Sequence, residues 1–194
     1  MLTVESFFDL SDFPHSELFK KNSFVWQALN ELKSYMDNYT YPQYDLIQDG
    51  IPLANHIIIH QGKTLSTENT HIEYGDTTKG KLTVNKNGET LDGASVVMAG
   101  ATLIGDRIDV GSGVLIESGA MVKSPTILGD RCEVRQGAYV RGYCLAGKRC
   151  ILGHTTEIKH SIFLNDAKAG HFAYLGDSIL GNNANLGAGT KFAN

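Results

Sequence analysis

The sequence predicts a mainly β protein whose second half is a left-handed parallel β-helix of hexapeptide repeats, and three observations predict it. An aliphatic residue recurs every six positions after about residue 90, and the position four residues later is small or β-branched in most repeats. Glycine is frequent, at 21 of 194 residues, while proline occurs only 4 times, which favours many tight turns over a linker. A period of six fits no 3.6-residue helical face, so we expect stacked coils that bury a continuous aliphatic ladder.

The aliphatic ladder can be followed by steps of six, and all its members except one alanine are Ile, Leu or Val. We expect the phase to slip near Gly176 and to resume at Leu180, Leu186 and Phe192. Such a slip is typical of a bulge or small loop, here expected at a functional edge. The members of the ladder are Ile104, Val110, Ile116, Val122, Leu128, Val134, Val140, Ala146, Leu152, Ile158 and Leu164.

The small positions of the repeat include the three cysteines. If three six-residue sides close one coil, Cys132 and Cys150 stack on neighbouring coils, which would bring them within disulfide range. An inward small position favours free cysteines that pack as small hydrophobic groups. The cysteine and histidine spacing fits no metal site, so we expect none. The small positions are Val114, Ala120, Thr126, Cys132, Ala138, Cys144, Cys150 and Thr156.

The first 90 residues do not follow the repeat, and we expect two domains, an α/β cap region over 1–90 and the β-helix over 91–194. The spacing from Ser23 to Met36 predicts an amphipathic helix, and Ser16-Glu17-Leu18 a short turn. Ile51 to His60 and Lys81 to Leu91 are typical of strands, the second with a hairpin turn at Asn87-Gly88. The cap is expected to cover the N-terminal end of the coil, which is otherwise an open sheet edge; an independent catalytic role is the alternative.

Composition narrows the class of partner. The net charge of −4 and the pI near 5.9 argue against nucleic acid or an anionic membrane surface. The chain contains no run of 18 apolar residues, and its acidic start does not resemble a signal peptide. We therefore expect a soluble, cytoplasmic globular protein.

Three cations fall in register if three six-residue sides close one coil. Lys123, Arg141 and Lys159 are 18 residues apart in turn, so they would stack about 5 Å apart on one face. Like charges so close repel unless an anion lies between them, and Arg and Lys both bind phosphate. The column therefore suggests phosphate binding; the alternative is a solvated edge offset by acidic neighbours such as Glu117 and Glu157.

His171 is the histidine with the most suggestive position, just before the expected phase slip and three residues before Tyr174. Histidine is the side chain best suited to take a proton from an amine or hydroxyl near neutral pH. A lone histidine is more often structural, and that interpretation also stays open.

Four segments resemble a known family. They are Gly137-Ala138-Tyr139-Val140-Arg141-Gly142, Gly153-His154-Thr155-Thr156-Glu157-Ile158-Lys159, Ala169-Gly170-His171-Phe172-Ala173-Tyr174-Leu175-Gly176-Asp177 and Asn183-Ala184-Asn185-Leu186-Gly187-Ala188-Gly189-Thr190. They are similar to the left-handed β-helix acetyltransferase domain of bifunctional N-acetylglucosamine-1-phosphate uridyltransferases and of related sugar-1-phosphate nucleotidylyltransferases.

The resemblance implies a role for each matching residue. His171 would be the general base that deprotonates the amine of glucosamine-1-phosphate. Arg141 and Lys159 would hold the phosphate, and Tyr174 and Asn185 would also contact the sugar phosphate. The acetyl donor would be acetyl-CoA, whose site would begin at Ala188 and Asn194. The resemblance further implies a homotrimer with sites between subunits and a place in UDP-N-acetylglucosamine synthesis for the cell envelope.

Other parts of the family pattern have no counterpart. Residues 1–90 do not resemble the Gly-rich loop of the nucleotidyltransferase domain, so uridylyl transfer and its magnesium site are not expected. In the family, further coils follow the position of Asn194 and supply much of the coenzyme A site. Two alternatives to the acetyltransferase are therefore kept: a non-catalytic subunit that binds a sugar phosphate or nucleotide sugar, and a structural trimer with a vestigial motif.

Overall fold

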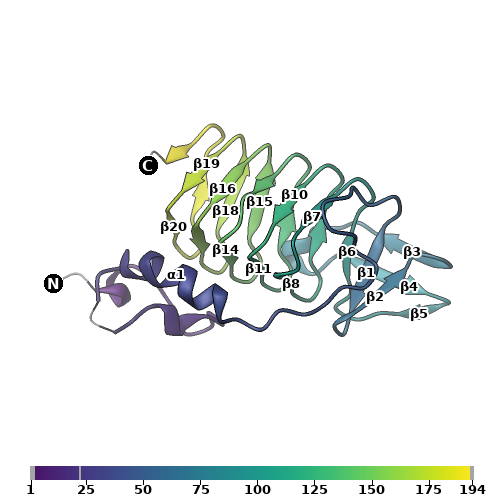
Figure 1. The fold of residues 1–194 in the computed structure, drawn as a ribbon, viewed down its shortest axis with the longest axis horizontal. Coiled ribbons are helices and arrows are strands. Elements are labelled where there is room, and N and C mark those ends of the chain that lie inside the picture. The colour runs from purple at the N-terminus through teal and green to yellow at the C-terminus, as the bar shows by residue number, and fades with distance from the viewer. Residues whose placement is uncertain (1–2, 22, 193–194) are drawn as a thin grey trace.

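The computed structural model describes residues 3–21 and 23–192, and it shows a three-sided β-helix with an N-terminal segment along one side (Figure 1). Each coil contributes one short strand to each of three parallel sheets, which we call face I, face II and face III. The parallel sheets fit the left-handed β-helix that the sequence predicted.

Face I is an eight-stranded sheet in the order β2-β1-β6-β9-β12-β15-β18-β21. The hairpin of β1 and β2 joins it antiparallel at the N-terminal end, and the pairs from β6 onward are parallel. Its strands are β1 (Ile57–His60), β2 (Lys63–Ser66), β6 (Ser95–Val97), β9 (Leu115–Ile116), β12 (Glu133–Val134), β15 (Ile151–His154), β18 (Lys168–His171) and β21 (Asn185–Leu186).

Faces II and III complete the coil, with six and five parallel strands. Face II contains β7 (Thr102–Ile104), β10 (Met121–Lys123), β13 (Tyr139–Val140), β16 (Glu157–Lys159), β19 (Tyr174–Gly176) and β22 (Lys191–Phe192). Face III contains β8 (Ile108–Val110), β11 (Thr126–Leu128), β14 (Cys144–Ala146), β17 (Ser161–Phe163) and β20 (Ile179–Leu180).

The predicted ladder fills the interior with two corrections. The strand register pairs Val122 with Leu103 and Ala146 with Phe163, so Leu103 and Phe163 point inward where Ile104 and Leu164 were expected. The predicted small positions are all buried, and the three cysteines are free. The buried ladder is Val97, Leu103, Val110, Ile116, Val122, Leu128, Val134, Val140, Ala146, Leu152, Ile158, Phe163, Ala169, Leu175 and Leu180.

The chain shortens by one residue at two corners between face II and face III. One is the expected slip after Leu175, where the ladder resumes at Leu180. The other, between Ile158 and Phe163, was missed because Leu164 satisfies the step of six by composition. Residues stacked on neighbouring coils are 19 apart between the first two coils on faces I and II. They are 18 apart from Val110 to Lys159 and 17 apart beyond it.

The N-terminal segment covers the outside of face III rather than only the end of the coil. Its helix α1 (Gln27–Asp37) begins four residues later than predicted, and the expected turn is the short 3₁₀ helix η2 (Ser16–Leu18). Another 3₁₀ helix, η1, spans Val4–Ser6. Residues from this segment pack against outward-facing aliphatics of face III; the buried members are Val4, Phe13, Leu18, Phe19, Ala28, Leu32 and Met36 with Ile127, Leu145, Ile162 and Leu164.

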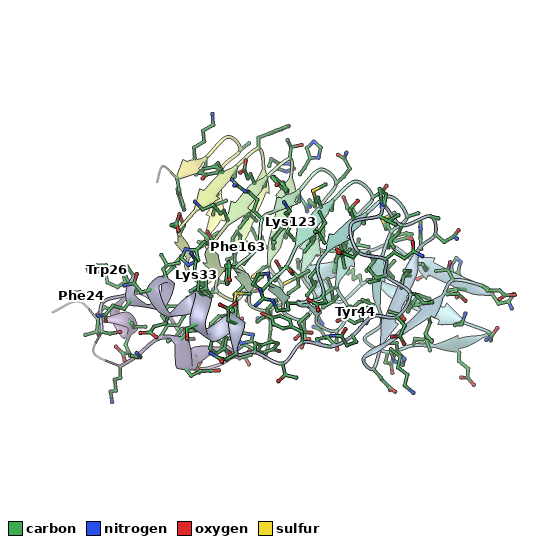
Figure 2. The ribbon with its side chains drawn as sticks, in the orientation of Figure 1. Phe24, Trp26, Lys33, Tyr44, Lys123 and Phe163 are labelled. Carbon is green, nitrogen blue, oxygen red and sulfur yellow. The ribbon has the colours of Figure 1, made fainter. Side chains whose placement is uncertain are left out.

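Polar contacts fix α1 to the coil. Arg107 donates to Asp37 at 2.6 Å, and the Tyr143 hydroxyl donates to the same carboxylate at 3.1 Å. Lys33 extends from α1 (Figure 2). Its ammonium lies over the Tyr143 ring, 5.6 Å from the ring centre. These contacts tie the helix to corners of the first and third coils.

Residues 40–90 cover the N-terminal end of the coil, as Figure 1 shows for the strands there. The chain after α1 pairs with the first coil through Leu53 and Ala101, and the predicted strand from Ile51 is shorter, only β1. A separate antiparallel sheet of β3 (Thr70–Glu73), β4 (Thr83–Lys86) and β5 (Glu89–Thr90) contains the expected turn at Asn87-Gly88, and η3 spans Thr77–Lys79. In the described part of the chain, no helix has the length and apolar character needed to cross a membrane.

Candidate functional site

The predicted cation column exists on the outer side of face II. Val122 pairs with Val140, and Val140 pairs with Ile158. Because Lys123, Arg141 and Lys159 each follow one of these inward residues, their side chains leave the same side of neighbouring strands. The column ends at Gly176, which pairs with Lys159. The spacing of 18 residues therefore predicted correctly that these three cations are neighbours.

Two of these cations already have carboxylate partners. Arg141 Nη1 lies 2.7 Å from Glu157 Oε1, and Lys159 Nζ lies 3.2 Å from Asp177 Oδ2. The hydrogen bond that Arg141 donates to Glu157 raises the pKa of Arg141 above its ordinary value. The four side chains are between 35% and 45% exposed, so a dissolved anion can reach these pairs and compete with the carboxylates.

Asp177 connects the cation column to the side chain of a histidine, His160. Its Oδ1 atom lies 2.6 Å from His160 Nδ1. Burial acts to raise the pKa of Asp177, but the hydrogen bonds from His160 and Lys159 outweigh it and hold that pKa below its usual range. The carboxylate is therefore charged near neutral pH and keeps Lys159 in place.

Lys123 has an aromatic neighbour instead of a carboxylate. Its ammonium lies 5.7 Å from the centre of the Tyr139 ring and 3.5 Å from the Tyr139 hydroxyl. Arg141 approaches the same ring, with its guanidinium carbon 5.9 Å from the centre. Tyr139 therefore offers each of the first two cations of the column a cation–π contact.

His171 lies at the corner between face I and face II, beside a second histidine. The register pairs His154 with His171. His154 Nδ1 lies 2.8 Å from the Gln136 carbonyl oxygen and must carry the hydrogen of that bond. His154 also meets the Phe172 ring edge-on at 5.3 Å. A constant spacing of 18 residues would pair His154 with Phe172. Because the shortened corner between Ile158 and Phe163 was not predicted, His154 was not expected beside His171.

The corner itself is a tight turn in the left-handed region. Phe172, which follows His171, has φ of 52°, and the equivalent residue of the previous coil, Thr155, has φ of 51°. Glycine occupies the same place in other coils, with φ of 73° at Gly137 and 81° at Gly189. The His171 and Phe172 side chains are both exposed, so the turn presents the imidazole to solvent.

The remaining predicted residues divide between the faces. Tyr174 begins β19 on face II and pairs with Glu157, which in turn holds Arg141. Asn185 lies on the outer side of face I, where it pairs with Lys168. Ala188 is exposed. It occupies the same corner position as His171 one coil further along, because Ala169 pairs with Leu186. Asn194 lies outside the described residues.

The structure therefore brings several predicted site residues together and places Asn185 apart from them. Arg141, Lys159 and Tyr174 share face II, with His171 at its edge. Arg141 donates a hydrogen bond to the Glu157 carboxylate. Glu157 stacks with Tyr174 in a second column, which lies nearer to His171 than the cation column does. Asn185 belongs instead to the neighbouring face.

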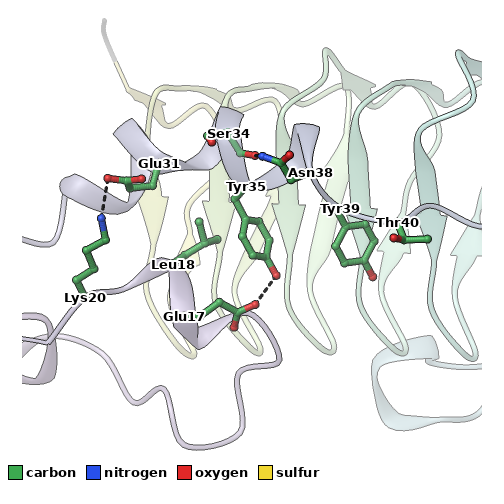
Figure 3. Close-up of a pocket in the computed structure, with 9 residues that line it drawn as sticks. All are labelled: Glu17, Leu18, Lys20, Glu31, Ser34, Tyr35, Asn38, Tyr39 and Thr40. Carbon is green, nitrogen blue, oxygen red and sulfur yellow. Dashed lines mark hydrogen bonds and ion pairs between the residues drawn. The ribbon is translucent and has the colours of Figure 1, made fainter.

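A separate hollow lies in the N-terminal segment, away from these residues (Figure 3). Its volume is about 740 Å³. Lys20 pairs with Glu31 at 2.9 Å, and the Tyr35 hydroxyl donates to Glu17 at 2.7 Å. Its charged groups thus already bind one another, and none of the predicted site residues lines it. Within residues 3–21 and 23–192, no group of three or more His, Cys, Asp or Glu side chains is placed to hold a metal ion.

No family model matches this chain. The chain is 37% identical over 110 residues to "Bifunctional protein GlmU" of Sorangium cellulosum (strain So ce56). The match covers 52% of this chain and 23% of that protein, so the chain spans about a quarter of the relative's length. In fold and in sequence, the repeat region fits the hexapeptide-repeat acetyltransferase domain of GlmU-like proteins.

Proposed function

We propose that this chain transfers an acetyl group from acetyl-CoA to the amine of glucosamine-1-phosphate or a related amino-sugar phosphate, in the route to UDP-N-acetylglucosamine. The observation that carries the proposal is the position of the exposed His171 imidazole at the edge of an open face that holds Arg141, Lys159 and Tyr174. The similarity to a bifunctional GlmU protein supports the same class of chemistry. We also propose the cytoplasm as its location, as expected from the sequence.

Substrate binding would begin with an exchange of anions. Glu157 and Asp177 hold Arg141 and Lys159 in the chain by itself, and the substrate phosphate would replace one or both carboxylates. A guanidinium can bind two phosphate oxygens at once, and an ammonium adds a point charge. The phosphate would then lie beside Tyr174, with the sugar extending toward His171.

The chemical step needs one base and no covalent enzyme intermediate. The amine lone pair attacks the thioester carbonyl carbon, a carbon–nitrogen bond forms, and the carbon–sulfur bond breaks to release the coenzyme A thiolate. His171 takes the proton that the amine loses and can return it to the thiolate. Ala188, small and exposed beside His171, leaves room for the thioester.

A homotrimer with sites between subunits is part of the proposal. The N-terminal segment already covers face III, while face II carries exposed side chains such as Met121, which is 37% exposed. A second copy against face II would shield the amine and the thioester from water, which strengthens electrostatic contacts within the site.

The second candidate is a non-catalytic subunit that binds a sugar phosphate or a nucleotide sugar. The structure gathers the acceptor residues Arg141, Lys159 and Tyr174 on face II, and binding by that group alone needs no acetyl donor. The two candidates share the acceptor site and differ only in acetyl transfer.

The test is release of coenzyme A thiol when the full chain is mixed with acetyl-CoA and glucosamine-1-phosphate. We expect turnover that falls by about 10²–10⁴-fold in His171→Ala, the range for loss of a general base, with glucosamine-1-phosphate binding retained. Arg141→Gln should weaken glucosamine-1-phosphate binding. Lys63→Gln on β2, far from face II, removes the same charge and is its control. Binding without turnover would select the second candidate, and wild-type chain that neither binds nor turns over glucosamine-1-phosphate would exclude both.

A further inference from the structure

The corner between face II and face III carries a largely buried histidine that the proposed mechanism does not use, His160. It is the only residue between β16 and β17, and Asp177 holds the same place one coil further along, because Lys159 pairs with Gly176. Both have a left-handed backbone, with φ of 45° at His160 and 47° at Asp177, a conformation that His and Asp adopt more readily than most residues. Their side chains therefore leave the corner in the same direction and meet.

His160 is a closer partner of Asp177 than Lys159 is. His160 Nδ1 lies 2.6 Å from Asp177 Oδ1, whereas Lys159 Nζ lies 3.2 Å from Oδ2. The His160 side chain is 15% exposed and that of Lys159 is 35% exposed. A short, sheltered hydrogen bond to a carboxylate contributes more than an exposed ion pair. We therefore expect a phosphate that approaches face II to draw Lys159 away from Asp177 and to leave the bond with His160 intact.

The hydrogen of that bond belongs to the imidazole. The Asp177 carboxylate is charged near neutral pH, so it accepts the bond and His160 Nδ1 donates it. Among the described residues, the other ring nitrogen, Nε2, is buried and has no hydrogen-bond partner. A hydrogen on Nε2 would be a buried donor without an acceptor, which costs free energy. The neutral ring with its hydrogen on Nδ1 therefore suits this corner.

The imidazole is also held from the preceding coil, by contacts that do not involve Asp177. Its ring meets the Tyr143 ring edge-on, with the ring centres 6.4 Å apart. The backbone N–H of His160 donates to the Gly142 carbonyl at 3.2 Å, and the Tyr143 hydroxyl donates to Asp37 of α1. These contacts keep His160 in place when Lys159 moves.

We propose that His160 is a positioning residue of the acceptor site: it keeps the Asp177 carboxylate at the corner while Lys159 turns from that carboxylate to the substrate phosphate. The inference rests on the proposed acceptor site, which both candidate functions share. With His160 present, Asp177 keeps one hydrogen-bond donor after Lys159 has left. Without it, Lys159 is the only side-chain partner of Asp177 within residues 3–21 and 23–192, so phosphate binding would leave the carboxylate bare. His160 thus favours phosphate binding without touching the phosphate.

The experiment measures the affinity of the full chain for glucosamine-1-phosphate by calorimetry at constant ionic strength. His160→Gly removes the donor with a residue that suits the left-handed backbone, and we expect the affinity to fall about threefold or more. Gln61→Gly makes the same exchange at φ of 51° in the turn between β1 and β2, far from face II, and should leave the affinity unchanged. His160→Asn carries its amide nitrogen near the position of Nδ1, so it should restore the affinity although it lacks the ring.

A double variant tests whether the effect passes through Asp177. Asp177→Asn replaces the carboxylate with a neutral amide, so adding His160→Gly to it should change the affinity little. The same loss in both backgrounds would overturn the proposal, as would a His160→Gly chain that binds as tightly as the wild type.

The asparagine variant separates hydrogen bonding from packing. If His160→Asn binds as weakly as His160→Gly, the ring matters only for packing and the proposal is wrong. If His160→Gly does not fold, His160→Gln replaces it, because its longer amide does not reach the position of Nδ1, and it should bind more weakly than His160→Asn. Wild-type chain that does not bind glucosamine-1-phosphate would overturn the acceptor site itself and this role with it, so the two failures are distinguishable.

Discussion

Faces II and III are built by the same coils and share the same interior, yet their outer sides differ completely. On face III the outward residues Ile127, Leu145 and Ile162 are buried beneath the N-terminal segment. On face II the equivalent positions carry Met121, Tyr139, Glu157 and Tyr174, which remain partly or fully accessible. The inward residues therefore decide that a coil forms, and the outward residues decide whether a face is covered or kept open for binding.

The largest effect is expected in the interior that the two faces share. Phe163→Ala removes the bulkiest fully buried side chain, just after the corner where the coil loses one residue. We expect a loss of about 3–5 kcal/mol in the free energy of unfolding, measured by chemical denaturation, with both faces loosened together in hydrogen exchange. Tyr74→Ala, at a residue 48% exposed, is the control, and a similar loss there would contradict the prediction.

A matched pair of variants tests the difference between the faces directly. Leu145→Ala on face III should lower the free energy of unfolding by about 2–5 kcal/mol because it opens a cavity under the N-terminal segment. Met121→Ala on face II should change it by about 0.5 kcal/mol or less, as for a surface substitution. Equal losses in the two variants would show that face II is covered as well, for instance by a second copy.

Acid should loosen face III before face II. Burial lowers the pKa of His15 below its ordinary value of 6.5, although the charges of Glu17 and Asp109 act in the opposite direction. The folded chain thus binds fewer protons at this site than the unfolded chain, and the stability that His15 contributes is lost as pH falls from about 6.5 through the lowered pKa. The Tyr35 hydroxyl gives its hydrogen to Glu17, so His15 Nδ1 donates to it at 2.7 Å, and protonation at Nε2 places a buried charge beside α1.

Hydrogen exchange at pH 7.5 and 5.5 measures this effect. We expect amides of β14 and α1 to lose protection at the lower pH while those of β13 change less. The loss should be smaller in His15→Gln, which does not titrate in this range. An unchanged pH response in that variant would assign the effect to another group.

The smallest effect on stability is expected on face II. Arg141→Gln removes an exposed ion pair, and such pairs contribute little, so the midpoint of unfolding should stay where it is in the wild type. Its affinity for glucosamine-1-phosphate, followed by calorimetry, should fall. A variant that binds as tightly as the wild type would remove Arg141 from the proposed acceptor site.

Much of the fold could be predicted from single residue types at fixed spacing. The ladder, the small inward positions and the hairpin at Asn87-Gly88 depend on local chemistry. The errors at Ile104 and Leu164 arose because an aliphatic or aromatic residue also stands at the true inward position beside each, and composition cannot choose between Phe163 and Leu164. Only the corner geometry, where the chain drops one residue, decides which of them points inward.

The candidate site was predicted in the same uneven way. Lys123, Arg141 and Lys159 were found because the regular spacing of three six-residue sides holds as far as Lys159. The neighbour of His171 is His154, one position away from the residue that this spacing selects, so the count failed there. The carboxylate partners of the cations could not be predicted from the sequence, since side-chain direction depends on the neighbouring coils.

The sequence by itself determined the coil, because a period of six allows one way to bury an aliphatic every sixth residue. It also determined which cations stack on face II. The tertiary structure decided that the N-terminal segment covers face III, that Asn185 lies on face I, and that Arg141 and Lys159 are held by carboxylates. These are relations between coils and faces, and a difference of one residue in coil length is enough to change them.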